Sequence, residues 1–238
     1  MNPATPRFAR LDALRGCAML WMAAFHFCFD LNQFRFIRQD FYENPFWTTQ
    51  RLMIVALFLT CAGLSQAVAL ERGQSWRRFG ARWLQLAGAA LLVSTGSWIM
   101  FPHSYISFGV LHGMAAMLLI SRLAAPLSRW LWPLGLIVLL LPQFIAHPWF
   151  DSRLTNWIGL VTEKPRTEDF VPILPWLGVL CWGLAAGQWI LRNRPNWLTG
   201  ALPAPLKPLA RLGRWPLSFY LLHQPVLIGL LLAAGSLR

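Results

Sequence analysis

The chain of 238 residues is 56% hydrophobic and only 13% charged, whereas soluble domains carry about 25% charged residues. Several apolar stretches reach roughly 20 residues, the length of a helix that crosses about 30 Å of hydrocarbon. The composition therefore excludes an ordinary soluble domain and predicts an all-α, polytopic membrane helical bundle. The net charge of +12 falls mainly in the loops, which is typical of membrane topology rather than of nucleic-acid binding.

We expect about seven transmembrane helices in one integral-membrane domain that covers residues 1–238. The expected spans are 11–32, 49–70, 79–100, 105–124, 128–146, 171–190 and 216–236. Basic residues concentrate before the first span and in alternate loops, including residues 72–82 and 192–214. Because cytoplasmic loops are enriched in Lys and Arg, this pattern predicts a cytoplasmic N-terminus.

The first expected span carries ionisable side chains on one face. Ten residues separate Arg15 from His26, which places them roughly 16 Å apart along a helix and only about 20° apart around it. Ionisable groups inside a membrane are costly to bury and are functional candidates by default. Asp30 follows His26 by one helical turn, where a carboxylate can orient an imidazole that acts as a general base. The alternative is a polar pair that only tightens helix packing.

The loop after the second span is dense in arginine. Arg77, Arg78 and Arg82 lie close together there, and guanidinium groups bind phosphates in bidentate geometry. The cluster is either a topology signal in contact with lipid headgroups or a site for a phosphate-bearing cytosolic cofactor.

His112 opens a later span between Gly109 and Gly113. This spacing of small residues permits close helix approach. His112 is therefore either a contact to the substrate or a histidine that bonds to a neighbouring helix.

The last span contains a third polar group, formed by Tyr220, His223 and Gln224 just before Pro225. Proline inside a helix frees a backbone carbonyl one turn earlier. The polar side chains either satisfy the backbone at this kink or line a cavity that contacts the substrate. No HxxxH or HExxH spacing accompanies any histidine, so no metal site is predicted.

These residues resemble the transmembrane acyltransferases. Arg15 and His26 are similar to the Arg-x10-His motif of type-3 membrane acyltransferases, and the chain more closely resembles bacterial relatives of heparan-alpha-glucosaminide N-acetyltransferase. The segments that carry the resemblance run in order through nearly the whole chain: Leu11–Gly16, His26–Asn32, Phe58–Ser65, Phe108–His112, Leu174–Gly178 and Leu212–Pro225.

The resemblance implies a membrane enzyme that moves an acyl group, in the first instance acetyl, from cytosolic acyl-CoA to an acceptor at the outer face. The acceptor would be a hydroxyl or amine of a carbohydrate or related small molecule. His26 would be the catalytic base, with Asp30 and Arg15 beside it in the catalytic group. Arg15 would also help hold the donor together with Arg77, Arg78 and Arg82, and no metal would be needed.

Two other classes of function remain open from the sequence. A proton-coupled transporter would use the intramembrane histidines as a relay, and an export or assembly protein would use them only for packing. Membrane lipids are expected partners in every case, nucleic acid is not, and a homo-oligomer remains open. The expected location is a bacterial inner membrane.

Overall fold

The computed structural model describes residues 8–100, 102–165, 167 and 169–235. This part of the chain is 76% helix and contains no strand, which confirms the all-helical prediction. The described residues divide into two compact units. Unit 1 runs up to Phe58 and resumes at Asn196, and unit 2 is Leu59–Pro195. The prediction of a single domain stays a prediction.

Five helical segments among the described residues are long and apolar enough to cross a membrane, so the expected count of about seven is not confirmed. They are Pro45–Glu71, Trp76–Met100, Val110–Gln143, Ile173–Asn193 and Pro216–Ala234. Two expected spans, 105–124 and 128–146, both overlap the segment Val110–Gln143, which counts once among the five. The first expected span is helical, but its charged residues, among them Asp12 and Arg15, lower its hydropathy.

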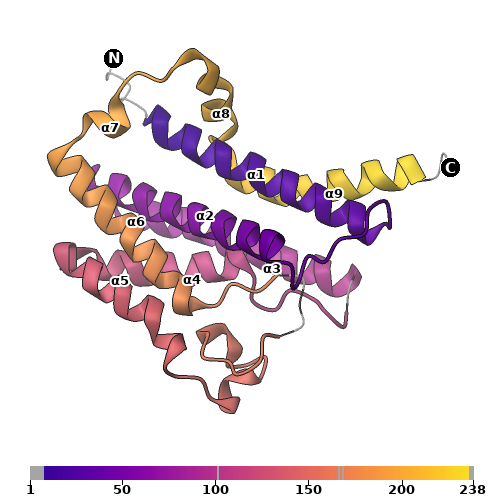
Figure 1. The fold of residues 1–238 in the computed structure, drawn as a ribbon. Helices are drawn as coiled ribbons and strands as arrows, with labels where there is room; N and C mark the ends of the chain where they lie inside the picture. The colour runs from indigo at the N-terminus through magenta and orange to yellow at the C-terminus, as the bar shows by residue number, and fades with distance from the viewer. Residues whose placement is uncertain (1–7, 101, 166, 168, 236–238) are drawn as a thin grey trace. The chain divides into compact units, whose positions relative to one another are not determined.

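Unit 1 is built around helix α1 (Ala9–Gln33), which packs against α7 (Asn196–Thr199), α8 (Lys207–Leu212) and α9 (Pro216–Gly235). Figure 1 shows α1 running beside α9. The first half of α2 (Pro45–Glu71) also belongs to this unit, and the short turn η5 (Ala204–Leu206) precedes α8.

A glycine at the end of α8 allows α8 to approach α1 closely. A Cβ atom on Gly213 would lie 1.8 Å from the backbone oxygen of Asp12, closer than any side chain can fit. Glycine is therefore required where the two backbones meet. This contact fixes where α9 begins and so which residues of α9 face α1.

Unit 2 contains the second half of α2 and the helices α3 (Trp76–Met100), α4 (Val110–Ala124), α5 (Leu131–Leu140) and α6 (Ile173–Asn193). Helix α6 packs against α4 and α5, and α3 packs against α4. The largest fully buried apolar side chains of this unit are Leu59, Met117, Leu131, Leu180 and Leu184.

Short 3-10 turns connect the helices of unit 2. They are η1 (Ala125–Trp130), η2 (Leu141–Gln143), η3 (Pro148–Asp151) and η4 (Asn156–Ile158). The last two belong to the long connection before α6, in which the side chain of Asn156 is fully buried. The connection is thus packed against its own unit rather than extended.

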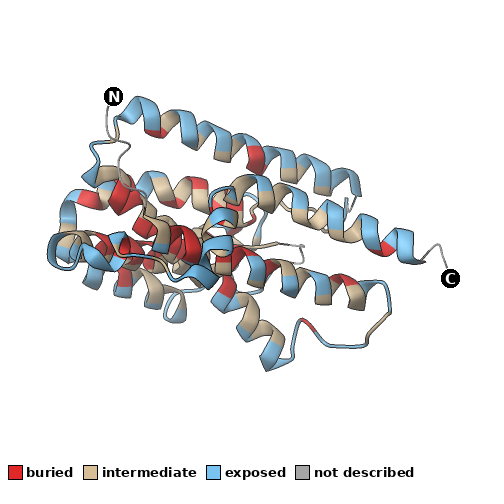
Figure 2. Cartoon of the chain, turned by 90° about the horizontal axis from the view of Figure 1, so that it is seen from above, coloured by how far each residue is buried: buried red, intermediate tan, exposed pale blue. Residues whose placement is uncertain are grey.

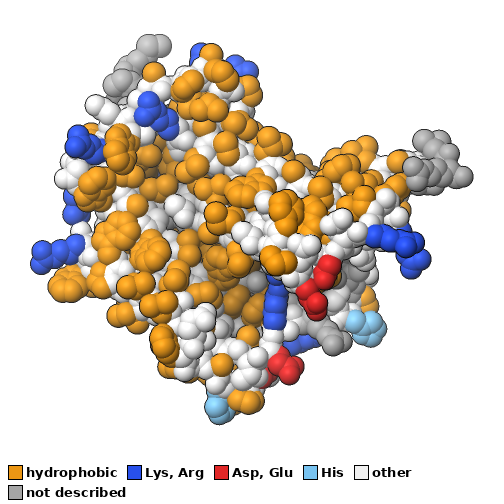
Figure 3. Space-filling view, viewed as in Figure 1, with side chains coloured by type: hydrophobic (Ala, Val, Ile, Leu, Met, Phe, Trp, Pro, Cys, Tyr) orange, Lys and Arg blue, Asp and Glu red, His pale blue; other side chains and the backbone are white. Residues whose placement is uncertain are grey.

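Much of the helical surface is apolar and exposed, as Figures 2 and 3 show. On α3 the exposed fractions of Leu91 and Ile99 are 65% and 71%, and on α9 that of Leu230 is 63%. Large apolar side chains at such exposure mark a surface that a partner or a membrane covers. Together with the five long apolar helices, this surface indicates an integral membrane protein.

Candidate active site

Arg15 fastens α1 to the end of α8. Its Nη1 atom donates to the carboxylate of Asp12 at 2.9 Å and to the backbone oxygen of Gly213 at 2.9 Å. Asp12 and Arg15 lie one turn apart on α1, which is a favourable spacing for an ion pair. Arg15 therefore holds the segment that leads into α9.

His26 of α1 and His223 of α9 face one another. Their ring centroids lie 5.1 Å apart with the planes tilted by 60°. Both imidazoles are half-buried. Two residues that are almost 200 positions apart in the sequence thus share one site, and the sequence spacing within α1 gave no sign of this pairing.

The ring of His223 is held by its own helix. Its Nδ1 atom lies 2.7 Å from the backbone oxygen of Tyr220, and the ring of Phe219 lies parallel to it at 5.8 Å. The Nε2 atom of His223 is buried and has no hydrogen-bond partner among the described residues. Two residues before Pro225, α9 therefore carries a fixed imidazole with one unused nitrogen.

Asp30 pairs with Gln224 rather than with His26. The Gln224 Nε2 amide donates to Asp30 Oδ1 at 2.8 Å, and Asp30 is only 4% exposed. Within the described residues no hydrogen bond joins Asp30 to His26, although the two share a helix face as expected. Asp30 Oδ2 and Gln224 Oε1 are buried and lack partners. We call His26, Asp30, His223 and Gln224 the His26 cluster.

His112 belongs to a second cluster in unit 2, at the start of α4. Its Nε2 lies 3.1 Å from Ser94 Oγ, which itself donates to the backbone oxygen of Ile106 at 2.6 Å. Its Nδ1 lies 3.4 Å from the backbone nitrogen of Gly109. Both ring nitrogens of His112 are therefore engaged within the fold.

Asp169 completes the start of α4 by accepting from the backbone N–H of Val110 at 2.7 Å. The first N–H groups of a helix have no partner inside the helix, and a carboxylate there also complements the helix dipole. We call Ser94, Gly109, His112 and Asp169 the His112 cluster. Its contacts cap the N-terminus of α4.

Arg77, Arg78 and Arg82 lie exposed in the first two turns of α3. Positions 78 and 82 are one helical turn apart, so their side chains can reach the same anion. Ser75 accepts a weak hydrogen bond from the N–H of Arg78 at 3.4 Å, as a helix N-cap does. The arrangement suits a phosphate on either a lipid or a cofactor.

Arg122 is a buried arginine that the sequence analysis did not single out. It is 6% exposed, its guanidinium lies over the rings of Trp76 and Phe79 at 4.7 and 4.6 Å, and it donates to Gln74 Oε1 at 3.2 Å. These contacts anchor the turn before α3 to α4. Arg122 therefore stabilises the start of α3, where the three exposed arginines lie.

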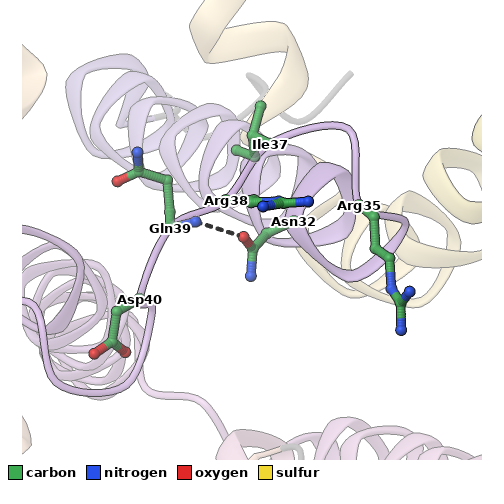
Figure 4. A pocket seen from close by; sticks show the side chains of 6 residues that line it. All are labelled: Asn32, Arg35, Ile37, Arg38, Gln39 and Asp40. Carbon is green, nitrogen blue, oxygen red and sulfur yellow. Dashed lines mark hydrogen bonds between the residues drawn. The ribbon is translucent and has the colours of Figure 1, made fainter.

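An open hollow of about 590 Å³ lies at the end of α1. Figure 4 shows the six residues that line it, Asn32, Arg35, Ile37, Arg38, Gln39 and Asp40. The backbone N–H of Gln39 donates to Asn32 Oδ1 at 2.7 Å and holds the loop against the helix. Asn32 follows His26 by six residues, roughly 9 Å along the axis.

Arg35 adopts an unusual backbone conformation beside this hollow. Its φ angle is 64°, the left-handed region in which helices usually end on glycine. The N–H of Phe36 donates to Leu31 O at 2.8 Å and that of Arg35 to Asn32 O at 3.0 Å. This pair of bonds is a Schellman motif with arginine where glycine is preferred, so the sequence gave no signal for it.

No group of three or more His, Cys, Asp or Glu side chains in the described part of the chain is placed to hold a metal ion. The arginines of α3 are exposed groups of the kind that binds phosphate.

The catalytic-region model for heparan-alpha-glucosaminide N-acetyltransferase matches residues 7–225 of the chain. The match includes both clusters and the arginines of α3. No curated protein and no solved structure matches the chain.

Proposed function

The chain belongs to the heparan-alpha-glucosaminide N-acetyltransferase family, and on that premise we propose that it transfers an acetyl group from cytosolic acetyl-CoA to a hydroxyl or amine of a carbohydrate or related small molecule at the outer face. The family makes the chain a membrane acetyltransferase. The donor, the base and the acceptor are the parts that we propose. The match over residues 7–225 is the observation that carries the proposal.

His26 is the proposed general base. Its imidazole takes the proton from the acceptor as the acceptor oxygen or nitrogen attacks the thioester carbonyl. The carbon–sulfur bond then breaks, and the proton passes to the departing thiolate to give free CoA. A positioned base contributes typically about 10² to 10⁴ in rate. Asp30 contributes by holding Gln224 at the acceptor position.

Arg77, Arg78 and Arg82 are the proposed binding groups for the phosphates of the donor. Their exposure at the start of α3 supports this role, because guanidinium groups form paired hydrogen bonds with phosphate oxygens. Arg15 is proposed to shape the site through its bonds to Asp12 and Gly213. The arginines belong to unit 2 and His26 to unit 1. The arginines are assigned to acetyl-CoA binding and His26 to proton transfer.

The proposed acceptor contacts are Tyr220, His223 and Gln224 of α9, with the hollow at the end of α1 as the entrance. Asp30 Oδ2 and Gln224 Oε1 are buried acceptors without partners, and hydroxyl or amine hydrogens of a sugar would satisfy them. We assign His112 to completing the first turn of α4, because both of its nitrogens are engaged there.

The test is acetyl-CoA binding and CoA release by the purified protein in lipid nanodiscs, with glucosamine and glucose as amine and hydroxyl probes. Arg77→Ala/Arg78→Ala is expected to weaken acetyl-CoA binding by about 10- to 100-fold, the effect of losing hydrogen bonds to charged groups. His26→Ala should bind acetyl-CoA normally and release no CoA above background.

Arg153→Ala is the matched control, since Arg153 is an exposed arginine in the long connection before α6 and should leave binding unchanged. Failure of the folded wild-type protein to bind acetyl-CoA would overturn the proposal. A carrier would instead move a solute across the membrane and give no acetylated product with either probe.

A further inference from the structure

We propose that His223 is the positioning partner of His26, and that its Nε2 atom accepts a hydrogen bond from His26 when His26 carries the proton of the acceptor. The inference rests on the proposed function, in which His26 is the base. It gives His223 a role that the sequence analysis had expected of Asp30.

The hydrogen bond inside α9 fixes which nitrogen of His223 is the acceptor. A backbone oxygen can only accept, so the Nδ1 atom that lies 2.7 Å from Tyr220 O carries the hydrogen. A neutral imidazole has one N–H and one lone pair. The lone pair is therefore on Nε2, which is buried and without a partner among the described residues.

The other members of the His26 cluster are also short of hydrogen-bond donors. Gln224 uses an amide hydrogen on Asp30 Oδ1, and the atoms left over are Asp30 Oδ2, Gln224 Oε1 and His223 Nε2. All three are acceptors in this arrangement. A buried acceptor without a donor costs about 1–3 kcal/mol, so the cluster is suited to receive a donor that appears only during the reaction.

His26 is placed to supply that donor. Its ring centroid lies 5.1 Å from that of His223, and the tilt of 60° between the rings excludes a simple stack. The parallel ring of Phe219 and the bond to Tyr220 hold His223 from the other sides. Asp30 binds Gln224 through Oδ1, and His223, with its unpartnered Nε2, is the member of the His26 cluster whose ring contacts that of His26.

The proton count is complete without a further reactant. The acceptor O–H or N–H bond breaks as its proton moves to the lone pair of His26, and the electron pair of that bond attacks the thioester carbon. Protonated His26 then has a second N–H, which donates to His223 Nε2. When the carbon–sulfur bond breaks, His26 returns the proton to the CoA thiolate, and both imidazoles are neutral again.

Three substitutions at one position separate this role from packing. His223→Asn keeps a donor at the place of Nδ1 but has no acceptor at the place of Nε2. His223→Phe keeps the ring against Phe219 and removes both nitrogens. His223→Gln places an amide oxygen where Nε2 lies, so it can still accept a hydrogen bond.

The measurement is kcat and KM for CoA release from acetyl-CoA, with glucosamine or glucose, whichever the wild-type protein acetylates. We expect kcat to fall about 10- to 100-fold in His223→Asn and His223→Phe, with KM for acetyl-CoA unchanged. His223→Gln should recover most of kcat. Wild-type kcat in the Asn variant would overturn the inference and show that only the backbone bond to Tyr220 matters. Wild-type kcat in the Phe variant would overturn it and show that the ring serves only for packing.

Failure of the inference differs from failure of the proposed function. If the proposed function is wrong, the wild-type protein itself releases no CoA and acetylates neither probe. If only the inference is wrong, the wild-type protein and at least one of the Asn and Phe variants turn over equally. Thermal unfolding of each variant in the same nanodiscs verifies that the compared proteins are folded.

Discussion

The His26 cluster and the His112 cluster place histidines in apolar helices and use their nitrogens differently. In the His112 cluster both ring nitrogens are hydrogen-bonded, to Ser94 and to Gly109. In the His26 cluster one nitrogen of His223 is bonded, and the other is buried without a partner. A satisfied histidine stabilises its fold, whereas an unsatisfied one costs stability that a ligand or a proton transfer can recover.

The two clusters also differ in where their histidines lie along the helices. His112 and Asp169 complete the first turn of α4, where backbone N–H groups need partners. His26 and His223 lie inside the long helices α1 and α9, away from the first turn of either helix. His223 uses one ring nitrogen on the backbone of α9 and keeps the other buried without a partner, and this favours a role in chemistry.

The largest expected effect comes from the glycine on which the His26 cluster depends. In Gly213→Ala the new Cβ atom would lie 1.8 Å from Asp12 O, so α8 must move away from α1. We expect the free energy of unfolding to fall by at least about 3 kcal/mol, at the upper end for overpacking. Thermal or denaturant unfolding in nanodiscs measures it.

Gly229→Ala is the matched control for this glycine. It lies within α9 with no atom inside 4 Å of an added Cβ, and alanine is favoured over glycine in a helix by about 1 kcal/mol. We therefore expect Gly229→Ala to be neutral or stabilising. Equal loss in both variants would contradict the close packing of α8 on α1.

A smaller effect is expected from His112→Ala. Removing the ring leaves the N–H of Gly109 without its partner and Ser94 Oγ with only its bond to Ile106 O, at a cost of about 1–3 kcal/mol in the free energy of unfolding. The turnover of the folded fraction should not change, because the ring serves α4. A raised KM for the acceptor in a fully stable variant would make His112 a substrate contact instead.

The smallest effect is expected at Arg35. Its φ of 64° is unfavourable for any residue with a side chain, and Arg35→Gly relieves this strain at the end of α1. After the larger entropy of glycine in the unfolded chain is counted, we expect a gain of about 0.5–1 kcal/mol. A loss in the unfolding measurement would mean that the guanidinium itself stabilises the loop around the hollow.

Composition was sufficient to predict the all-helical class, and long apolar runs placed most of the helices. The count of spans was harder to predict, because the apolar stretch Val110–Gln143 holds two shorter helices, α4 and α5, joined by the turn η1. In the first helix, charged residues such as Asp12 and Arg15 lower the hydropathy. Hydropathy alone then does not distinguish a membrane span from a helix packed inside the protein.

The candidate site could be predicted residue by residue but not pair by pair. Helical spacing correctly placed Arg15, His26 and Asp30 on α1, yet the only partner it offered Asp30 was His26, one turn away. The actual partners, Gly213, His223 and Gln224, lie almost 200 residues away. Helix periodicity carries information about neighbours on one helix and none about which helix packs against it.

The most direct test of the account compares His26→Gln with His112→Gln in one acetyl-CoA turnover assay, normalised to folded protein. The account predicts that kcat falls by about 10² to 10⁴ in His26→Gln, while His112→Gln keeps wild-type kcat and loses only stability. Loss of kcat in His112→Gln, with wild-type turnover in His26→Gln, would place the chemistry in the other cluster and contradict the account.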